Sequence, residues 1–257
     1  MRIPFIAGSV VLAALLVVYV GCGFTPNMEA VAEFQAAQKA FDQAASPDDY
    51  LKVAAMYGEM LDRGVRSGAI LYNQGNAFMK AGRRGQAVAA YLEAKRYLPS
   101  NPYLEANLRF ATGGLAASEP KPLVEHILFW QNRISYGAKF ALAGAGAAAL
   151  FTFALVWLFR PEPLFRRLTL TVAMVFAVLA FSAAYDWYRF DYVTHGVVTG
   201  DEVVARKGNS VTYEPAFTEA LPEGTKFRVL ETRGDWHLVS LSGDKQGWIK
   251  ESQSVLF

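Results

Sequence analysis

Two apolar stretches and the basic loop between them decide the architecture of this chain: GAKFALAGAGAAALFTFALVWLF at residues 137–159, RPEPLFRR at residues 160–167 and LTLTVAMVFAVLAFSAA at residues 168–184. The first stretch carries a single charge near its start, and the second is uncharged and continues into an aromatic-rich end. An α-helix of about 20 apolar residues crosses a hydrocarbon core of about 30 Å. The sequence therefore predicts a transmembrane hairpin in which helices at residues 137–159 and 168–188 flank a cytoplasmic loop at residues 160–167.

Basic residues predict which way this hairpin crosses the membrane. Arg160, Arg166 and Arg167 lie in the short loop, and short loops rich in Arg and Lys stay in the cytoplasm. Arg2, ahead of another apolar run, places the start of the chain on the same side. The segments before and after the hairpin are then both expected outside the cytoplasm.

The N-terminal apolar run, residues 3–21, follows the single basic residue Arg2. A short basic start ahead of an apolar run is typical of a signal peptide or a signal anchor, and residues 1–22 are assigned to one of these two. The run ends in Val-Gly-Cys-Gly, where a lipoprotein signal would be cleaved and Cys22 would be lipidated. The alternative is an uncleaved anchor with an incidental cysteine.

The composition agrees with a membrane anchor that carries ordinary soluble domains. The chain has 257 residues, of which 53% are hydrophobic and 19% are charged, with a formal net charge of +2 and one cysteine. Dominant disorder needs low hydrophobicity and high charge, so this class is excluded, and one cysteine excludes a disulfide scaffold. The small net charge leaves no basic footprint for nucleic acid, which is not expected as a partner.

The segment at residues 27–115 is expected to be helical throughout. Gly75 and Ala87 are small where two antiparallel helices would cross closely, and Phe78 and Tyr91 would fill the space between those helices. The full spacing consists of Leu71, Gly75, Phe78, Ala87, Tyr91, Ala94 and Pro99. This spacing resembles the tetratricopeptide repeat, which implies stacked pairs of antiparallel helices.

One such repeat cannot bury its apolar faces alone, so neighbouring elements are expected. A degenerate repeat with helices near residues 27–44 and 47–63 precedes it, and a capping helix starts at Asn101-Pro102. Folds of this kind bind extended or helical peptides on their concave face. The residues predicted to line that face are Tyr72, Asn73, Asn76 and Lys80. The alternative is that these are ordinary solvated side chains.

The C-terminal segment, residues 197–257, alternates like short β-strands with regular turn signals. Its pattern of Glu-Gly-x-x-Phe-x-Val-Leu from Glu223, Gly-Asp-Trp ending at Trp236 and Gly-Trp-Ile around Trp248 resembles bacterial SH3-like domains. Each tryptophan belongs either to the core of that barrel or to a ligand groove. In related domains such a groove can hold cell-wall peptide.

The sequence contains no recognisable catalytic, phosphate-binding or metal-binding motif. The histidines at positions 126, 195 and 237 are scattered and lack a metal-ligand spacing such as H-E-x-x-H. A phosphate-binding Gly-Lys-Ser/Thr loop is absent, and the single cysteine lies at the membrane boundary. The sequence therefore predicts a non-enzymatic protein with no catalytic residues, no cofactor and no metal.

The sequence thus predicts a multidomain membrane protein with all-α tetratricopeptide-like repeats, a two-helix transmembrane hairpin and a C-terminal all-β SH3-like barrel. This order, with the stretch from Asn73 to Phe78 and the cap from Asn101 to Leu108, resembles the E protein family of the Bat aerotolerance operon. Genes for a MoxR-type ATPase and von Willebrand A-domain membrane proteins usually lie beside that family.

The resemblance implies a scaffold of the bacterial inner membrane that presents two protein-binding modules to the periplasm in a stress-tolerance complex. Its expected partners are envelope proteins, among them the A-domain proteins with their ATPase, and the lipid bilayer. The alternative function is a cell-wall sensor that binds peptidoglycan through the SH3-like domain.

Overall fold

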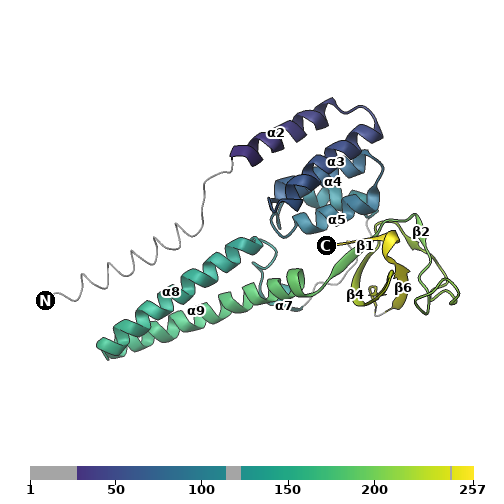
Figure 1. Ribbon diagram of the computed structural model, residues 1–257. Helices are drawn as coiled ribbons and strands as arrows, with labels where there is room; N and C mark the ends of the chain where they lie inside the picture. Colours follow the sequence, from purple (N-terminus) through teal and green to yellow (C-terminus); the bar gives the residue numbers. More distant parts are fainter. Residues whose placement is uncertain (1–27, 114–122, 244) are drawn as a thin grey trace. The chain divides into compact units, whose positions relative to one another are not determined.

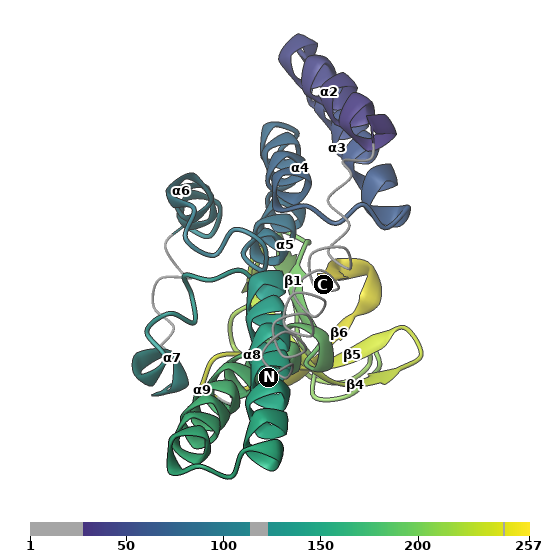
Figure 2. The same ribbon diagram turned by 90° about the vertical axis from the view of Figure 1, so that its left-hand side faces the viewer.

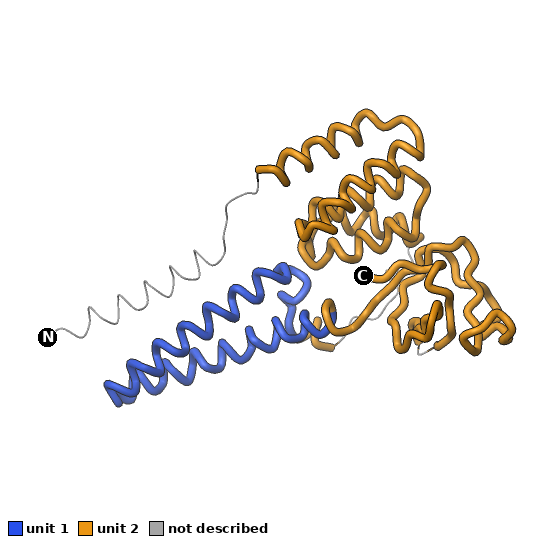
Figure 3. Tube along the Cα trace, in the orientation of Figure 1, with its two compact units in different colours: residues 1–26, 128–189 blue, residues 27–127, 190–257 orange. Residues whose placement is uncertain are grey.

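The computed structural model describes residues 28–113, 123–243 and 245–257. The first apolar run and Cys22 lie outside the described residues. The described chain divides into two compact units, one at residues 128–189 and the other formed by residues 27–127 together with residues 190–257 (Figure 3).

The second unit begins with a series of helices that pack pairwise (Figure 1). They are α2 (Met28–Gln43), α3 (Pro47–Asp62), α4 (Gly68–Lys80), α5 (Arg84–Ala94) and α6 (Pro102–Ala111). The first two coincide with the helices expected near residues 27–44 and 47–63. Helix α6 starts where Asn101 accepts hydrogen bonds from the backbone N–H groups of Tyr103 and Leu104, with Pro102 in the first turn.

Ser46 starts helix α3 through a reciprocal cap. Its hydroxyl oxygen accepts a hydrogen bond from the backbone N–H of Asp49 at 3.2 Å, and the Asp49 carboxylate accepts one from the backbone N–H of Ser46 at 3.2 Å. Hydrogen bonds from the Ser46 side chain and backbone hold the pKa of Asp49 below its usual value. The ionised carboxylate is therefore the form that the folded helix favours.

Replacing Ser46 with alanine is expected to lower the free energy of unfolding by about 1 kcal/mol, because the N–H of Asp49 loses its acceptor. Urea unfolding of the detergent-solubilised chain, followed by circular dichroism, measures this loss. A carboxylate whose pKa is lowered by folding stabilises the fold above its ordinary pKa and loses that contribution as the pH falls. The difference between wild type and Ser46→Ala should therefore shrink on acidification, and a constant difference would contradict the reciprocal cap.

Close contact between α4 and α5 depends on a glycine. A Cβ placed on Gly75 would lie 2.4 Å from Cε1 of Tyr91, so only hydrogen fits at this crossing. Tyr91 is buried between the helices, as the spacing predicted. The turn that reverses the chain contains Gly82 at φ 74°, a left-handed conformation that glycine adopts without strain.

The rest of this unit is built from short β-strands. Antiparallel strands form a five-stranded sheet in the order β6-β5-β4-β1-β7, and β2 pairs with β3. Their bounds are β1 (His195–Val198), β2 (Glu202–Val203), β3 (Leu221–Pro222), β4 (Lys226–Arg233), β5 (Trp236–Ser240), β6 (Gln246–Lys250) and β7 (Ser254–Leu256). A core of Val198, Val203, Phe227, Val239 and Ile249 fills the space between them.

Helices and strands share a core within this unit. Val197 of β1 belongs to the buried cluster of the helices, and Val255 and Phe257 pack against the same cluster. The β-strands also supply the missing cap of α5. Arg83, the residue before α5, makes no side-chain cap, whereas the Glu223 carboxylate accepts a hydrogen bond from the backbone N–H of Gly85 at 2.6 Å. A negative charge at a helix N-terminus is stabilising.

The first unit is a hairpin of two long apolar helices, α8 (Tyr136–Phe159) and α9 (Pro163–Trp187), which lie side by side in both views (Figure 1 and Figure 2). Both are long and apolar enough to cross a membrane, by length and composition. Large apolar side chains are exposed along them, including Phe151, Leu158, Leu170 and Met174. A π-helical turn, η2 (Tyr188–Tyr192), follows α9.

Helix α9 begins at Pro163, five residues before the predicted start at Leu168, so the loop is shorter than the predicted residues 160–167. Proline is favoured in the first helical turn because its fixed φ suits the helix and its missing N–H is not needed there. Arg166 and Arg167 therefore lie on the helix itself. Long basic side chains at a helix end can extend their charged groups toward water.

A buried polar cluster closes one end of the hairpin. Lys139 donates hydrogen bonds to the Asp186 carboxylate at 2.5 Å and to the backbone carbonyl of Gln131 at 2.6 Å. The Gln131 amide donates to the other carboxylate oxygen of Asp186 at 2.5 Å and accepts a hydrogen bond from Ser182 at 2.7 Å. The side chains of Lys139 and Asp186 are each 3% exposed, so this is a fully buried ion pair.

Candidate functional site

A hollow of about 420 Å³ lies on the helices of the second unit. We call it the helical hollow, and its lining residues are Phe41, Asn76, Met79, Lys80, Tyr91, Asn107 and Phe110. These residues come from α2, α4, α5 and α6, so the stacking of successive helices creates the site. Phe110 is 78% exposed, which leaves an aromatic ring available at the rim.

Hydrogen bonds fix the polar side of the helical hollow. The side-chain oxygen of Asn76 accepts a hydrogen bond from the Tyr91 hydroxyl at 2.8 Å and another from the Asn107 amide at 2.9 Å. The same Asn107 amide donates to the Tyr72 hydroxyl at 3.2 Å. Because the Asn76 oxygen is occupied within the protein, its amide N–H groups are the part of that side chain left for a ligand.

The electrostatic character of the helical hollow is that of a donor site. Burial raises the pKa of Tyr91 well above its ordinary value, so its hydroxyl stays protonated and keeps donating to Asn76. Lys80 is exposed and supplies the only formal charge among the lining residues. An ammonium group beside amide donors suits an acceptor-rich or anionic group, while Phe41, Met79 and Phe110 suit apolar side chains.

The four residues predicted for the concave face have different surroundings. Asn76 and Lys80 line the helical hollow. Tyr72 is not among the lining residues; its hydroxyl accepts a hydrogen bond from Asn107, and its ring centre lies 6.0 Å from that of Tyr91. Asn73 is hydrogen-bonded to Tyr57. Burial raises the pKa of Tyr57 above its ordinary value, and the hydrogen bond with Asn73 offsets only part of this rise.

Sequence reasoning missed the contributions of Asn107 and Phe110 to the hollow. Both lie on α6, which was predicted only as a cap. The available signal was their spacing of three residues, which places both on one side of a helix, with the polar group beside an exposed aromatic.

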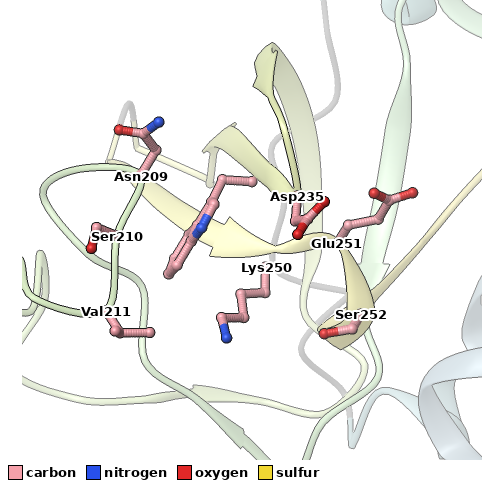
Figure 4. Close-up of a pocket in the computed structure, with 8 residues that line it drawn as sticks. Asn209, Ser210, Val211, Asp235, Lys250, Glu251 and Ser252 are labelled. Atoms are coloured by element: carbon pink, nitrogen blue, oxygen red, sulfur yellow. The ribbon is translucent and has the colours of Figure 1, made fainter.

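A second hollow, of about 650 Å³, lies on the β-strands. We call it the Trp236 hollow, and its lining residues are Asn209, Ser210, Val211, Asp235, Trp236, Lys250, Glu251 and Ser252. Figure 4 shows Asn209, Ser210 and Val211 on a loop at one side, and Asp235, Lys250, Glu251 and Ser252 at the other. The Lys250 ammonium lies 5.8 Å from the centre of the Trp236 ring.

The two tryptophans that the sequence left between core and groove occupy different positions. Trp248 is 8% exposed and lies mid-strand, with the Arg233 guanidinium 5.5 Å from its ring centre. Trp236 is half-buried at the start of β5 and lines the hollow. The structure therefore places Trp248 with the buried residues and Trp236 at a surface site.

Chemical groups for metal binding are scattered. Within residues 28–113, 123–243 and 245–257, no group of three or more His, Cys, Asp and Glu side chains is arranged to hold a metal ion. Buried His237 accepts or donates one hydrogen bond, 3.0 Å from the Thr232 hydroxyl. Comparison of the chain with family models, with curated proteins and with solved structures found no match.

Proposed function

We propose that this chain is a non-enzymatic membrane scaffold that holds a segment of a partner protein in the helical hollow. The observation that carries the proposal is the helical hollow itself, in which stacked helices combine apolar walls with oriented amide donors and Lys80. The pairwise helices support a tetratricopeptide-like fold, and the small antiparallel sheet supports an SH3-like barrel.

The membrane placement in this proposal rests on the hairpin. Helices α8 and α9 anchor the chain in the bacterial inner membrane, with Arg160, Arg166 and Arg167 on the cytoplasmic side. The helical and β-strand regions then lie together in the periplasm.

The partner in this proposal is an envelope protein with an acidic, apolar-flanked segment. The donor character of the helical hollow favours a carboxylate, and Phe41, Met79 and Phe110 favour apolar neighbours of that carboxylate. By its resemblance to the Bat operon E proteins, the chain would take this segment from a von Willebrand A-domain membrane protein that works with a MoxR-type ATPase.

Site-specific photocrosslinking in intact cells tests this function. A photoreactive amino acid in place of Phe110 is expected to capture the A-domain protein. The same group in place of Tyr103, which is 72% exposed on the same helix but outside the hollow, should not capture it. Lys80→Glu should reduce the product at position 110 by about tenfold, because charge reversal removes a charge-assisted hydrogen bond. Equal products from both positions, or no effect of Lys80→Glu, would contradict the proposal.

A second candidate function is attachment to the cell wall through the β-strands, and the open Trp236 hollow favours it. Co-sedimentation of the full-length detergent-solubilised chain with purified sacculi tests this function. The chain should appear in the pellet, and a chain that stays in the supernatant at every sacculus concentration would refute wall attachment.

A further inference from the structure

Four of the polar side chains that line the Trp236 hollow are not used by the fold, whereas the Ser210 hydroxyl is hydrogen-bonded to Thr212. The side chains of Asn209, Asp235, Glu251 and Ser252 make no hydrogen bond or ion pair with any described residue. The Lys250 ammonium makes no hydrogen bond or ion pair with a described residue and lies 5.8 Å from the centre of the Trp236 ring. Ligand-binding sites typically contain a few polar groups that converge on one hollow and have hydrogen-bonding capacity left for the ligand.

An aromatic surface forms one wall of the same hollow. Trp236 is half-buried at the start of β5, where the antiparallel pairing with Arg233 and Lys250 holds its backbone. The indole is therefore presented by a strand and not by a loose loop. Its Nε1–H has no partner among the described residues, which adds a donor to the hollow.

The charges in the Trp236 hollow limit the ligand class. Asp235 and Glu251 are negative and Lys250 is positive, so neither a polyanion nor a polycation matches the lining. Asn209, Ser210 and Ser252 add neutral amide and hydroxyl groups. A ligand that suits this mixture carries many small groups that both donate and accept hydrogen bonds, together with one flat apolar face.

We propose that the Trp236 hollow binds a pyranose ring of a glycan strand. In this proposal the C–H face of the sugar packs on the indole, and its hydroxyl and acetamido groups bond with Asn209, Asp235 and the neighbouring polar side chains. Figure 4 shows these lining side chains. This inference rests on the second candidate function, cell-wall attachment, and deepens it by naming the sugar of the wall as the recognised part.

Isothermal titration of the full-length chain with the tetramer of N-acetylglucosamine tests the proposal, in a detergent that has no sugar headgroup. Wild type should bind the tetramer. Trp236→Ala should weaken binding by about tenfold or more, because a buried aromatic contact dominates such sites. Trp236→Phe should lose less affinity because it keeps an aromatic face, and Asp235→Asn should weaken binding severalfold because an amide replaces the charged acceptor.

A matched control comes from strand β4. Leu230 is 40% exposed and does not line the hollow, so Leu230→Ala should bind the tetramer as wild type does. All variants should unfold cooperatively and be fully folded at the temperature of the titration, which circular dichroism checks. Failure of wild type to bind the tetramer, or equal binding by Trp236→Ala, would overturn the sugar assignment.

Two further binding experiments distinguish a failure of the pyranose proposal from a failure of the wall-attachment proposal. A synthetic peptide of the cell-wall stem is titrated beside the tetramer, and full-length protein is sedimented with sacculi. Sacculus binding together with peptide binding and no tetramer binding would overturn the pyranose assignment and leave wall attachment intact. Loss of binding in every arm would overturn both.

Discussion

Replacing Asp186 with alanine is expected to destabilise the α8–α9 hairpin by about 3–5 kcal/mol, because it leaves the Lys139 ammonium buried without its counterion. The same change removes one of the two acceptors of the buried Gln131 amide and leaves it only the backbone carbonyl of Ser182. An ionisable side chain in a membrane helix raises the free energy of the folded state unless it is paired. Removing one member of the pair therefore leaves the other as an uncompensated buried charge. Unfolding in mixed micelles with a rising fraction of sodium dodecyl sulfate, followed by circular dichroism, measures this loss.

Two further variants separate the loss of the pair from the loss of a side chain. Glu162→Ala removes an exposed charge of the same hairpin, next to the start of α9, and should change the unfolding midpoint little. The double variant Lys139→Met with Asp186→Leu removes both charges and should recover much of the stability, because buried ion pairs often do no better than well-packed apolar residues. A double variant as unstable as Asp186→Ala would contradict the ion-pair account.

Hydropathy was sufficient to locate the hairpin, since apolar length is a local property of the sequence. Hydropathy placed the start of α9 too late, because the charged residues Arg166 and Arg167 lower the mean hydropathy and were assigned to the loop. A helix end accepts such residues, since their long side chains can reach water. Hydropathy also could not identify the buried partner of Lys139. Asp186 lies 47 positions away, and only the packing of two helices brings the charges together.

In the candidate sites too, local spacing predicted some residues, and others depend on how distant elements pack. Repeat spacing located Asn76 and Lys80, because one helical face recurs with a fixed period. It could not show that Asn107 and Phe110 complete the helical hollow, since they lie on a helix whose position depends on the turn before it. Period-two alternation left Trp236 and Trp248 equivalent. Their difference comes from position, because Trp236 begins a strand next to an open loop and Trp248 lies mid-strand.

The least predictable contact is the one that joins helices to strands within the second unit. Glu223 caps α5 from 138 positions away, and nothing near Arg83 signals that the cap will come from elsewhere. The sequence predicted two separate domains, at residues 27–115 and 197–257. The structure groups both in one compact unit, with Val197 buried among the helices.

Gly85→Ala is expected to cost about 2–3 kcal/mol and to loosen this junction, because there is no room for a methyl group. A Cβ on Gly85 would lie 2.5 Å from the backbone oxygen of Val198 and 2.8 Å from Cα of Thr199. Those are backbone atoms of the β1 end, which cannot swing aside as a side chain can. Alanine is otherwise the better helix former, so a loss of stability reports the contact and not helix propensity.

Gly58→Ala on α3 provides the matched control. A Cβ there would lie 3.3 Å from Nε2 of Gln74, a side-chain end that donates a hydrogen bond to the backbone carbonyl of Ala54. A side chain can shift more easily than the backbone atoms that face Gly85, so this variant should change the free energy of unfolding much less than Gly85→Ala does. Hydrogen exchange of the full-length chain then locates the effect. In Gly85→Ala, amides of α5 and β1 should exchange faster while those of α3 stay protected, because the clash falls at the junction. If Gly85→Ala were as stable as Gly58→Ala and equally protected, helices and strands would not share a core, and the two hollows would be carried by independent domains.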